Sequence, residues 1–182
     1  MMPKSLQRTR RSASGRIIPF IFALGLVAGC AGTGGSRTPQ GRWHSDKPVS
    51  ISTDDRQVLQ DASGFKEISA KAKLPPAVVA LCTDKTGKLA EPGKRWNSGC
   101  VINPDLASNR LIWAATNDDY YVVHYEWGGF VGSAHVLIVR FNGDAAGTKV
   151  VWRGSGWWLK NYEDFLDALQ TRRLEDEREY VR

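Results

Sequence analysis

The sequence predicts an α+β domain, in which an antiparallel β-meander of about four strands packs with a short N-terminal helix and a C-terminal helix. Three observations support this. Runs of β-branched and aromatic residues between positions 111 and 153 are separated by short turns that contain Asn, Asp or Gly. A proline-initiated apolar segment precedes these runs, and a segment with helical spacing of apolar residues follows them. Short connections favour antiparallel pairing of the strands.

The strands are expected at residues 111–115, 120–127, 134–141 and 148–153. A helix at 77–82 follows a Leu-Pro-Pro start, and a second helix begins at its N-cap Asn161. Residues 51–73 are ambiguous between helix and loop, and residues 171–182 are expected to extend the last helix as a frayed, charged tail. Alternation predicts a core face with Leu111, Trp113, Tyr121, Val123, Tyr125 and Trp127.

The first 29 residues have the features of an export signal. Five Lys and Arg residues without an acid precede an apolar run at 17–27, which is too short to span a bilayer because a spanning helix takes about 20 residues. The segment that follows, Val27-Ala28-Gly29-Cys30, resembles the lipobox of bacterial lipoproteins. The resemblance implies cleavage before Cys30 and attachment of lipid to it, with fatty acyl chains such as palmitate. The alternative is an ordinary secretory peptide with an incidental cysteine.

This resemblance divides the chain into a signal peptide at 1–29, a lipidated flexible tether at 30–48 and a single periplasmic domain at 49–182. In Gram-negative members of the class, Ala31 and Gly32 after the lipidated cysteine imply the outer membrane, facing the periplasm. The leader holds five of the 25 basic residues and none of the 19 acidic ones, so the mature chain is nearly neutral. It lacks the basic field that binding to nucleic acid requires.

Cys82 and Cys100 remain as an even pair in an oxidising compartment, and we expect a disulfide between them. This bond would close a loop rich in Gly and Pro and would contribute ~3 kcal/mol in the chain-entropy description. The alternatives are two buried free thiols or a metal site, although the loop contains no histidine. The sequence therefore predicts neither a metal nor a cofactor.

Candidate chemistry lies on the polar face of the predicted sheet. Arg110, Glu126 and His135 are expected to face one another across three strands, with His124 two residues along. Such a row can ligate a metal ion, provide a histidine base oriented by Glu126, or bind an anionic ligand. The alternative is a solvated face on which unlike charges lie opposite each other without a function. A Gly-x-Ser-x-Gly segment typical of serine hydrolases is missing from the sequence.

Three of the seven tryptophans are candidate contact residues. Trp127 precedes the Gly128-Gly129 turn, and Trp157 and Trp158 are adjacent, between glycines and a helix start. Because neighbouring residues of a strand point to opposite faces, at least one of the adjacent pair is expected to be partly exposed. This suits a contact surface for protein or glycan. Alternatively, the three cover the open end of a small sheet.

The segment at 120–129, Tyr-Tyr-Val-Val-His-Tyr-Glu-Trp-Gly-Gly, is similar to strands of uncharacterised proteobacterial secreted proteins, and this similarity implies no activity. Three functional hypotheses follow. The first is a non-enzymatic binding module for an envelope or exported protein, of the inhibitor or immunity type by analogy alone. The second is an envelope hydrolase or metal-dependent enzyme that uses the polar sheet face. The third is a structural accessory of the envelope.

Overall fold

The computed structural model describes residues 49–129 and 132–177. The predicted signal peptide, the lipidation site Cys30 and the predicted tether lie outside the described residues, as do residues 130–131 and 178–182. Within the described ranges the α+β class is confirmed. The sheet, however, has six strands and not about four.

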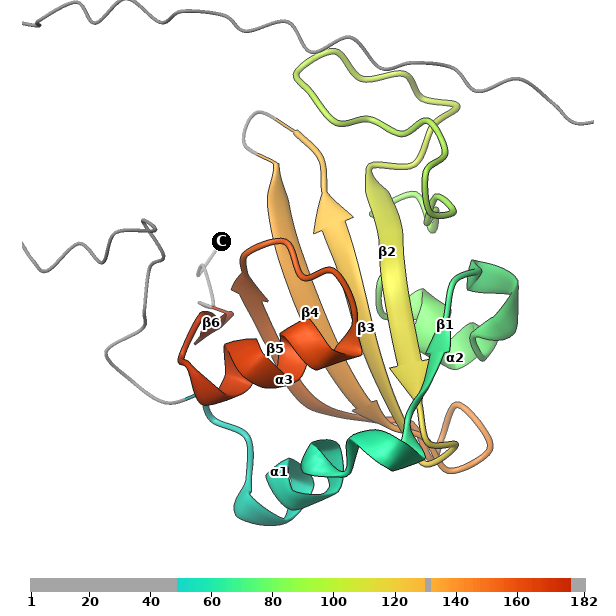
Figure 1. The fold of residues 1–182 in the computed structure, drawn as a ribbon. Helices are drawn as coiled ribbons and strands as arrows, with labels where there is room; N and C mark the ends of the chain where they lie inside the picture. Colours follow the sequence, from blue (N-terminus) through green and yellow to red (C-terminus); the bar gives the residue numbers. More distant parts are fainter. Residues whose placement is uncertain (1–48, 130–131, 178–182) are drawn as a thin grey trace, which may run out of the picture. The chain divides into compact units, whose positions relative to one another are not determined.

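The strands form one antiparallel sheet in which each is paired with its neighbours in sequence, so the chain meanders from β1 to β6 (Figure 1). The strands are β1 (Lys66–Ile68), β2 (Asn109–Thr116), β3 (Tyr120–Trp127), β4 (Ser133–Arg140), β5 (Lys149–Gly156) and β6 (Leu174–Asp176). The helices are α1 (Thr53–Gln60), α2 (Pro76–Ala80) and α3 (Tyr162–Gln170), with 3-10 turns η1 (Ala62–Gly64) and η2 (Lys71–Lys73). The four long strands, β2 to β5, are the four that the sequence predicts.

The two edge strands, β1 and β6, are absent from the prediction because each has only three residues, too few for an alternating pattern. The predicted extension of the last helix is wrong. The helix ends at Gln170, and Arg172 takes the left-handed conformation with φ of 56°, which turns the chain back. Residues Leu174–Asp176 then pair with β5, and Leu174 becomes fully buried.

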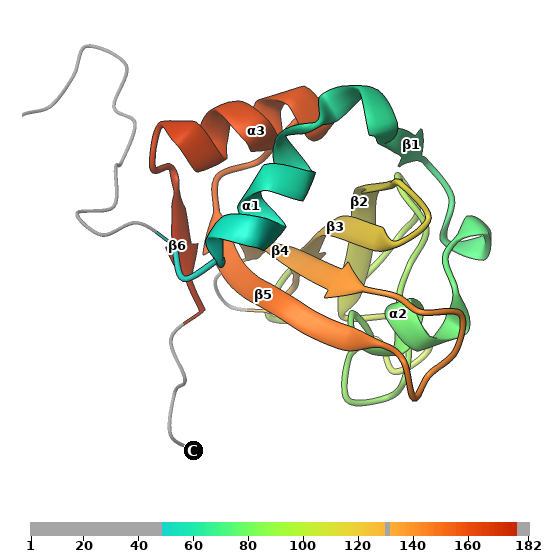
Figure 2. The same cartoon turned by 90° about the horizontal axis from the view of Figure 1, so that it is seen from below.

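Both faces of the sheet are covered. Helices α1 and α3 lie over one face, and α2 lies over the other (Figure 2). The core beneath α1 and α3 includes Leu59, Trp113, Val122, Val136, Ile138, Trp152 and Phe165, and the core beside α2 includes Val78, Leu111, Tyr121, Val123, Tyr125 and Leu137. The prediction of one core face opposite a solvated polar face is therefore wrong.

A β-bulge in β2 changes the predicted membership of the core. The register between β2 and β3 shifts between Leu111 and Trp113, so that Leu111 lies opposite Tyr125 and Trp113 lies opposite His124. The extra residue turns Trp113 to the face under α3, away from Leu111. The prediction that the two residues share a face with Tyr125 holds for Leu111 only.

Local sequence signals explain where the helices begin. The side chain of Asn161 accepts a hydrogen bond from the backbone N–H of Asp164 at 2.9 Å, which confirms Asn161 as the N-cap of α3. Asp164 in turn accepts one from the N–H of Lys160 at 3.0 Å, so the two side chains form a reciprocal cap. Ser52 caps α1 in the same way, and Pro76 occupies the first turn of α2.

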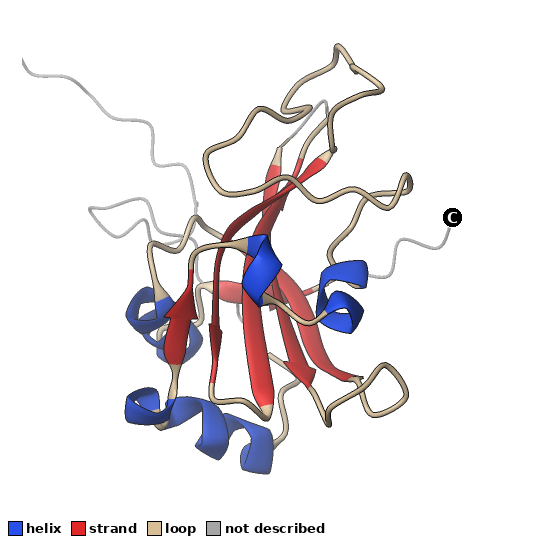
Figure 3. Ribbon diagram, turned by 90° about the vertical axis from the view of Figure 1, so that its right-hand side faces the viewer, coloured by secondary structure: helices blue, strands red, loops and turns tan. Residues whose placement is uncertain are grey.

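A long loop connects α2 to β2 and extends past the ends of the strands (Figure 3). Its far part is closed by the buried side chain of Asn97, which bonds the backbone of Asn103 at 2.9 Å and of Leu106 at 3.0 Å. This loop contains the exposed Val101 and Ile102. None of the helices in the described part of the chain combines the length and apolarity needed to cross a membrane.

Candidate functional site

The predicted polar row does not form, because the pairing of β3 with β4 differs by one residue from the expected register. His135 lies opposite Tyr125, and Glu126 lies opposite Ala134. Since successive side chains of a strand point to opposite faces, His135 projects away from the face that carries Glu126 and His124. The four candidate residues are therefore divided between two buried faces, and the proposed two-histidine metal site and the Glu126–His135 dyad are both incorrect.

The pairing of Arg110 with Glu126 is confirmed. The two residues lie opposite each other in β2 and β3, and the Arg110 guanidinium forms an ion pair with the Glu126 carboxylate. The guanidinium also lies 4.9 Å from the ring centroid of Trp96, in the long loop. Glu126 is 3% exposed, and burial raises the pKa of its carboxyl group against the opposing effect of Arg110. This pair fastens the long loop to the sheet.

His124 is a fully buried structural residue whose two ring nitrogens are both hydrogen-bonded. Its Nδ1 donates to the carbonyl oxygen of His135 at 2.9 Å, and its Nε2 accepts from the backbone N–H of Leu159 at 3.1 Å. Burial lowers its pKa to about 4, so the ring is neutral near pH 7. With both nitrogens bonded within the core, His124 has none left to ligate a metal ion or accept a proton from a substrate.

His135 belongs to an aromatic cluster on the other face. Its ring centroid lies 4.4 Å from that of Trp127 and 5.6 Å from that of Tyr125, and its Nε2 shares a hydrogen bond of 2.7 Å with the Ser133 hydroxyl. Burial, with a smaller effect from Arg153, lowers the pKa of His135 to about 4. A histidine with such a pKa is a weak general base near neutral pH, so the Ser133–His135 pair is poorly suited to nucleophilic catalysis.

The predicted disulfide is not formed in this structure. Cys82 is 1% exposed, in the core beside α2, whereas Cys100 lies in the exposed part of the long loop, and both are free thiols. Burial raises the pKa of the Cys82 thiol to about 12. Across residues 49–129 and 132–177, no group of three or more His, Cys, Asp or Glu side chains is arranged to hold a metal ion.

A groove of about 430 Å³ lies where β4 begins and β5 ends. Its size falls in the range of small-molecule sites, roughly 300–1,000 Å³. The groove is lined by Gly132, Ser133, Ala134, Ser155, Gly156, Trp157, Trp158, Arg173 and Glu175. These residues come from β4, β5 and β6, from the residues directly before β4 and β6, and from the segment that joins β5 to α3, so the meander itself brings them together.

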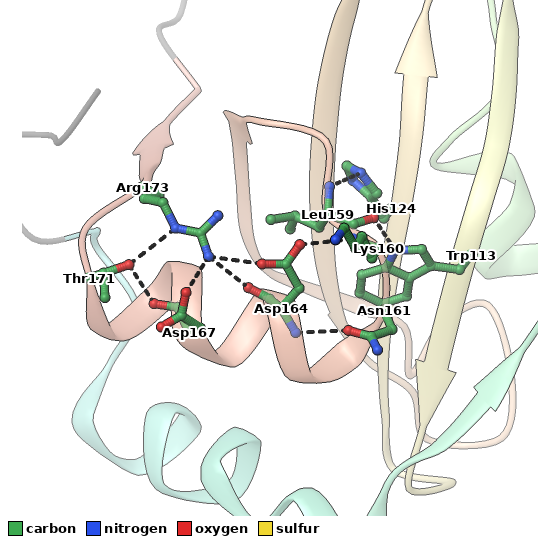
Figure 4. A network of polar contacts seen from close by, with 9 residues as sticks. All are labelled: Trp113, His124, Leu159, Lys160, Asn161, Asp164, Asp167, Thr171 and Arg173. Carbon is green, nitrogen blue, oxygen red and sulfur yellow. Dashed lines mark hydrogen bonds and ion pairs between the residues drawn. The ribbon is translucent and has the colours of Figure 1, made fainter. Parts of the chain in front are cut away.

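The two indole rings of the groove belong to side chains that remain open to solvent. Trp157 is 47% exposed and Trp158 is 57% exposed, although both are large and apolar. The next residue, Leu159, is buried and is held through both backbone groups, because its N–H bonds His124 and its carbonyl oxygen accepts from Trp113 Nε1 at 2.8 Å (Figure 4). The core thus fixes the chain immediately beside the exposed pair.

The backbones of β5 and β6 lie in close contact beside the groove. A Cβ atom added at Gly156 would lie 2.7 Å from Leu174 Cδ2, and one added at Gly154 would lie 2.3 Å from the carbonyl oxygen of Glu175. Only glycine allows the two strands to approach so closely. These glycines therefore set the position of Glu175 at the groove.

Two charged residues line the groove, Arg173 and Glu175. The guanidinium of Arg173 turns towards α3, where it pairs with Asp164 at 2.9 Å and with Asp167 (Figure 4). Those pairs raise the pKa of Arg173 against the effect of its burial and lower that of Asp164. Glu175 is exposed and, among the described residues, its carboxylate has no hydrogen-bonding or ion-pair partner. Among the charged residues that line the groove, the charge of Arg173 is therefore balanced by carboxylates of α3, and Glu175 is the one whose charge is unpaired.

The structure places the three predicted contact tryptophans in different environments. Trp157 and Trp158 border the groove, whereas Trp127 is half-buried against His135 and does not line it. Ser133, Ser155 and Glu175 line the groove but are not among the residues predicted from the sequence. The two serines flank strand ends next to small residues, which is a weak signal, and Glu175 could not be assigned to a site without the unpredicted strand β6.

Comparison of the chain with protein-family models, curated proteins and solved structures found no match.

Proposed function

We propose that this protein is a lipoprotein, anchored to the outer membrane through lipid on Cys30, that acts as a non-enzymatic binding module for an envelope or exported protein. The observation that carries the proposal is the groove with its two exposed indoles. Exposed tryptophans beside a concave surface are typical of binding hot spots, because they offer a large contact area at a small cost in side-chain entropy.

The arrangement of the titratable residues favours binding over catalysis. His124 uses both ring nitrogens in the core, and the pKa of His135 is lowered to about 4. Glu126 is engaged by Arg110. The residues on which an envelope hydrolase would rest are thus committed to holding the sheet and its loops, while the open residues at the groove are aromatic, small or acidic.

The proposed lipid anchor and tether would hold this module near the membrane surface. The lipobox at Val27-Ala28-Gly29-Cys30 supports lipidation, and residues 30–48 support a flexible connection between the lipid and the fold. A module of this kind reaches partners close to the membrane surface. We propose an inhibitor-type or immunity-type role, in which occupation of the groove by the partner is the function.

The test is recovery of a partner by the full chain, carrying a C-terminal affinity tag and purified from cross-linked envelopes in a non-ionic detergent. A specific protein should be recovered with the native chain and lost with the Trp157→Ala/Trp158→Ala variant. A matched control is Val150→Ala, which removes another exposed apolar side chain, in β5 at the far end of the strand from the groove. Recovery of the same partner by the tryptophan variant, or of no specific partner under any growth condition, would overturn the proposal.

Attachment to the membrane through lipid is tested separately with the Cys30→Ser variant. The native chain should sediment with the membrane fraction and carry the mass of acyl chains, and the variant should do neither. If the variant remains in the membrane fraction after washing with high salt, lipid on Cys30 is not what anchors the chain.

A further inference from the structure

The charge of the groove suggests what chemistry its occupant carries, and this inference rests on the proposed function. Two charged residues line the groove, Arg173 and Glu175. Only 6% of the Arg173 side chain is exposed, and its guanidinium is already paired with two carboxylates, Asp164 and Asp167. Arg173 is therefore not available to an anionic ligand.

Glu175 is the opposite case. It is exposed, it lines the groove, and within the described part of the chain its carboxylate bonds no other group. Because Asp164 and Asp167 already balance the charge of Arg173, the Glu175 carboxylate is the unpaired charge among the residues that line the groove. An anionic ligand would be repelled there, and a cationic one attracted.

The indoles supply a second interaction with the same preference. The face of a tryptophan ring carries negative electrostatic potential, and tryptophan is the strongest aromatic partner for ammonium and guanidinium groups. Trp157 and Trp158 both border the groove and are about half exposed. A neutral sugar can also stack on an indole, but it would gain little from an unpaired carboxylate. A cation gains from both.

We infer that the groove receives a basic side chain, Lys or Arg, presented by the protein partner. Its charged end lies between the indole faces and the Glu175 carboxylate, and its methylene stem packs on the same rings. The Ser155 hydroxyl, which lines the groove and has no hydrogen-bonding partner among the described residues, accepts a hydrogen bond from the bound group. Since no covalent bond is formed, binding is reversible.

The experiment is an NMR titration of the full chain in a non-ionic detergent, followed through the indole N–H resonances, with Trp157→Phe and Trp158→Phe used for assignment. The probes are Nα-acetyl-lysine methylamide, Nα-acetyl-arginine methylamide and the neutral Nα-acetyl-norleucine methylamide, with a neutral disaccharide as a fourth. At least one cationic probe should shift the Trp157 and Trp158 resonances saturably and bind about tenfold more tightly than norleucine.

Glu175→Gln is the decisive variant, because it removes the charge and preserves the shape of an exposed side chain. It should weaken binding of the cationic probe severalfold and leave norleucine unchanged. The matched control is Glu163→Gln, which removes an exposed carboxylate on α3 that does not line the groove. Binding of the cation that is equal to that of norleucine, that is unaffected by Glu175→Gln, or that is exceeded by the disaccharide would overturn the inference.

The experiments distinguish failure of this inference from failure of the proposed function. If the cationic probes do not bind but the partner is still recovered through Trp157 and Trp158, the proposed function stands and the basic side chain is excluded. If the cationic probes bind as expected but no partner is recovered, the groove chemistry stands and the proposed function fails.

Discussion

The backbone N–H of Leu159 donates a hydrogen bond to Nε2 of His124 across 3.1 Å, in the fully buried space between the sheet and the segment before α3. The carbonyl oxygen of the same residue accepts from Trp113 Nε1. One residue of the β5–α3 connection is thus held by side chains from two strands (Figure 4). Because Leu159 directly follows Trp157 and Trp158, this contact links the core of the sheet to the proposed binding groove.

Replacement of His124 by alanine should lower the free energy of unfolding by about 2–4 kcal/mol, because it leaves the Leu159 N–H buried without a partner, removes the hydrogen bond to the His135 carbonyl oxygen and opens a cavity. His124→Gln, which can still place an acceptor near Leu159, should lose less. Urea unfolding followed by circular dichroism measures both. If the two variants are equally stable, the hydrogen bond to Leu159 contributes nothing beyond the volume of the ring.

The two buried histidines predict a dependence of stability on pH. Burial lowers the pKa of His124 from 6.5 to about 4, and that of His135 likewise. Below pH 6.5 the unfolded chain therefore binds protons that the folded chain does not. The contribution of the two histidines to the free energy of unfolding is fully present above pH 6.5 and falls as the pH is lowered towards 4. His124 alone should account for about 3 kcal/mol over this range. Unfolding free energies measured at steps of half a pH unit test this, and His124→Gln should flatten the profile by roughly half. A native chain whose stability is constant from pH 7 to 4.5 would contradict it.

The sequence could predict the regular elements of this fold because their signals are local. The runs that became β2 to β5 contain β-formers bounded by turn residues, and Asn161 lies at the start of an amphipathic segment. In β3, Val122 and Val123 belong to the two alternating sets of side chains, and both are fully buried. Apolar residues on both faces of a strand indicate a sheet that is covered on both sides. His124 and Glu126 in the same strand led instead to the prediction of a polar face.

Register and long-range contacts could not be predicted in the same way. The bulge between Leu111 and Trp113 contains no Gly or Pro to mark it, and the connection from β3 to β4 could close with either of two pairings of Trp127. Because the observed register differs by one residue from the predicted one, His135 lies on the other face of the sheet and the predicted polar row does not form. The groove depends on β6, whose three residues reach β5 only through the turn at Arg172.

Gly128 should be intolerant of a side chain, for a reason of space and not of backbone flexibility. A Cβ atom at this position would lie 1.6 Å from the carbonyl oxygen of Asn97, so the long loop would have to move away from the hairpin. Gly128→Ala should lower the free energy of unfolding by about 2 kcal/mol or more. Gly99→Ala is the matched control, because its Cβ would meet no atom within 4 Å. Thermal unfolding compares the two, and equal melting temperatures would show that the contact with Asn97 is easily relieved.

The two cysteines of the domain should differ sharply in reactivity. Cys100 is exposed, whereas burial raises the pKa of Cys82 to about 12 from an ordinary value of 9.0. The thiolate fraction of Cys82 at neutral pH is therefore about 1,000-fold below that of an unperturbed thiol. A chromogenic disulfide reagent should label the native protein rapidly at Cys100, and Cys82 only after unfolding. Cys100→Ser should abolish the fast phase and Cys82→Ser should preserve it. A native protein that labels only after reduction would instead show that the two cysteines are joined.

Tyr162 and Tyr125 are both buried, but only the hydroxyl of Tyr162 is hydrogen-bonded among the described residues. The hydroxyl of Tyr162 donates to the carbonyl oxygen of Leu59 at 2.7 Å. That of Tyr125, which is fully buried beside His135, bonds no other atom of the described residues. Tyr162→Phe should therefore lower the free energy of unfolding by about 1 kcal/mol, because it leaves the Leu59 carbonyl unpaired. Tyr125→Phe should leave stability unchanged or raise it by up to about 1 kcal/mol, because it removes a buried hydroxyl that has no partner. Urea unfolding of the two variants side by side measures the difference. If Tyr125→Phe is the more destabilising of the two, the Tyr125 hydroxyl has a bonded partner in solution.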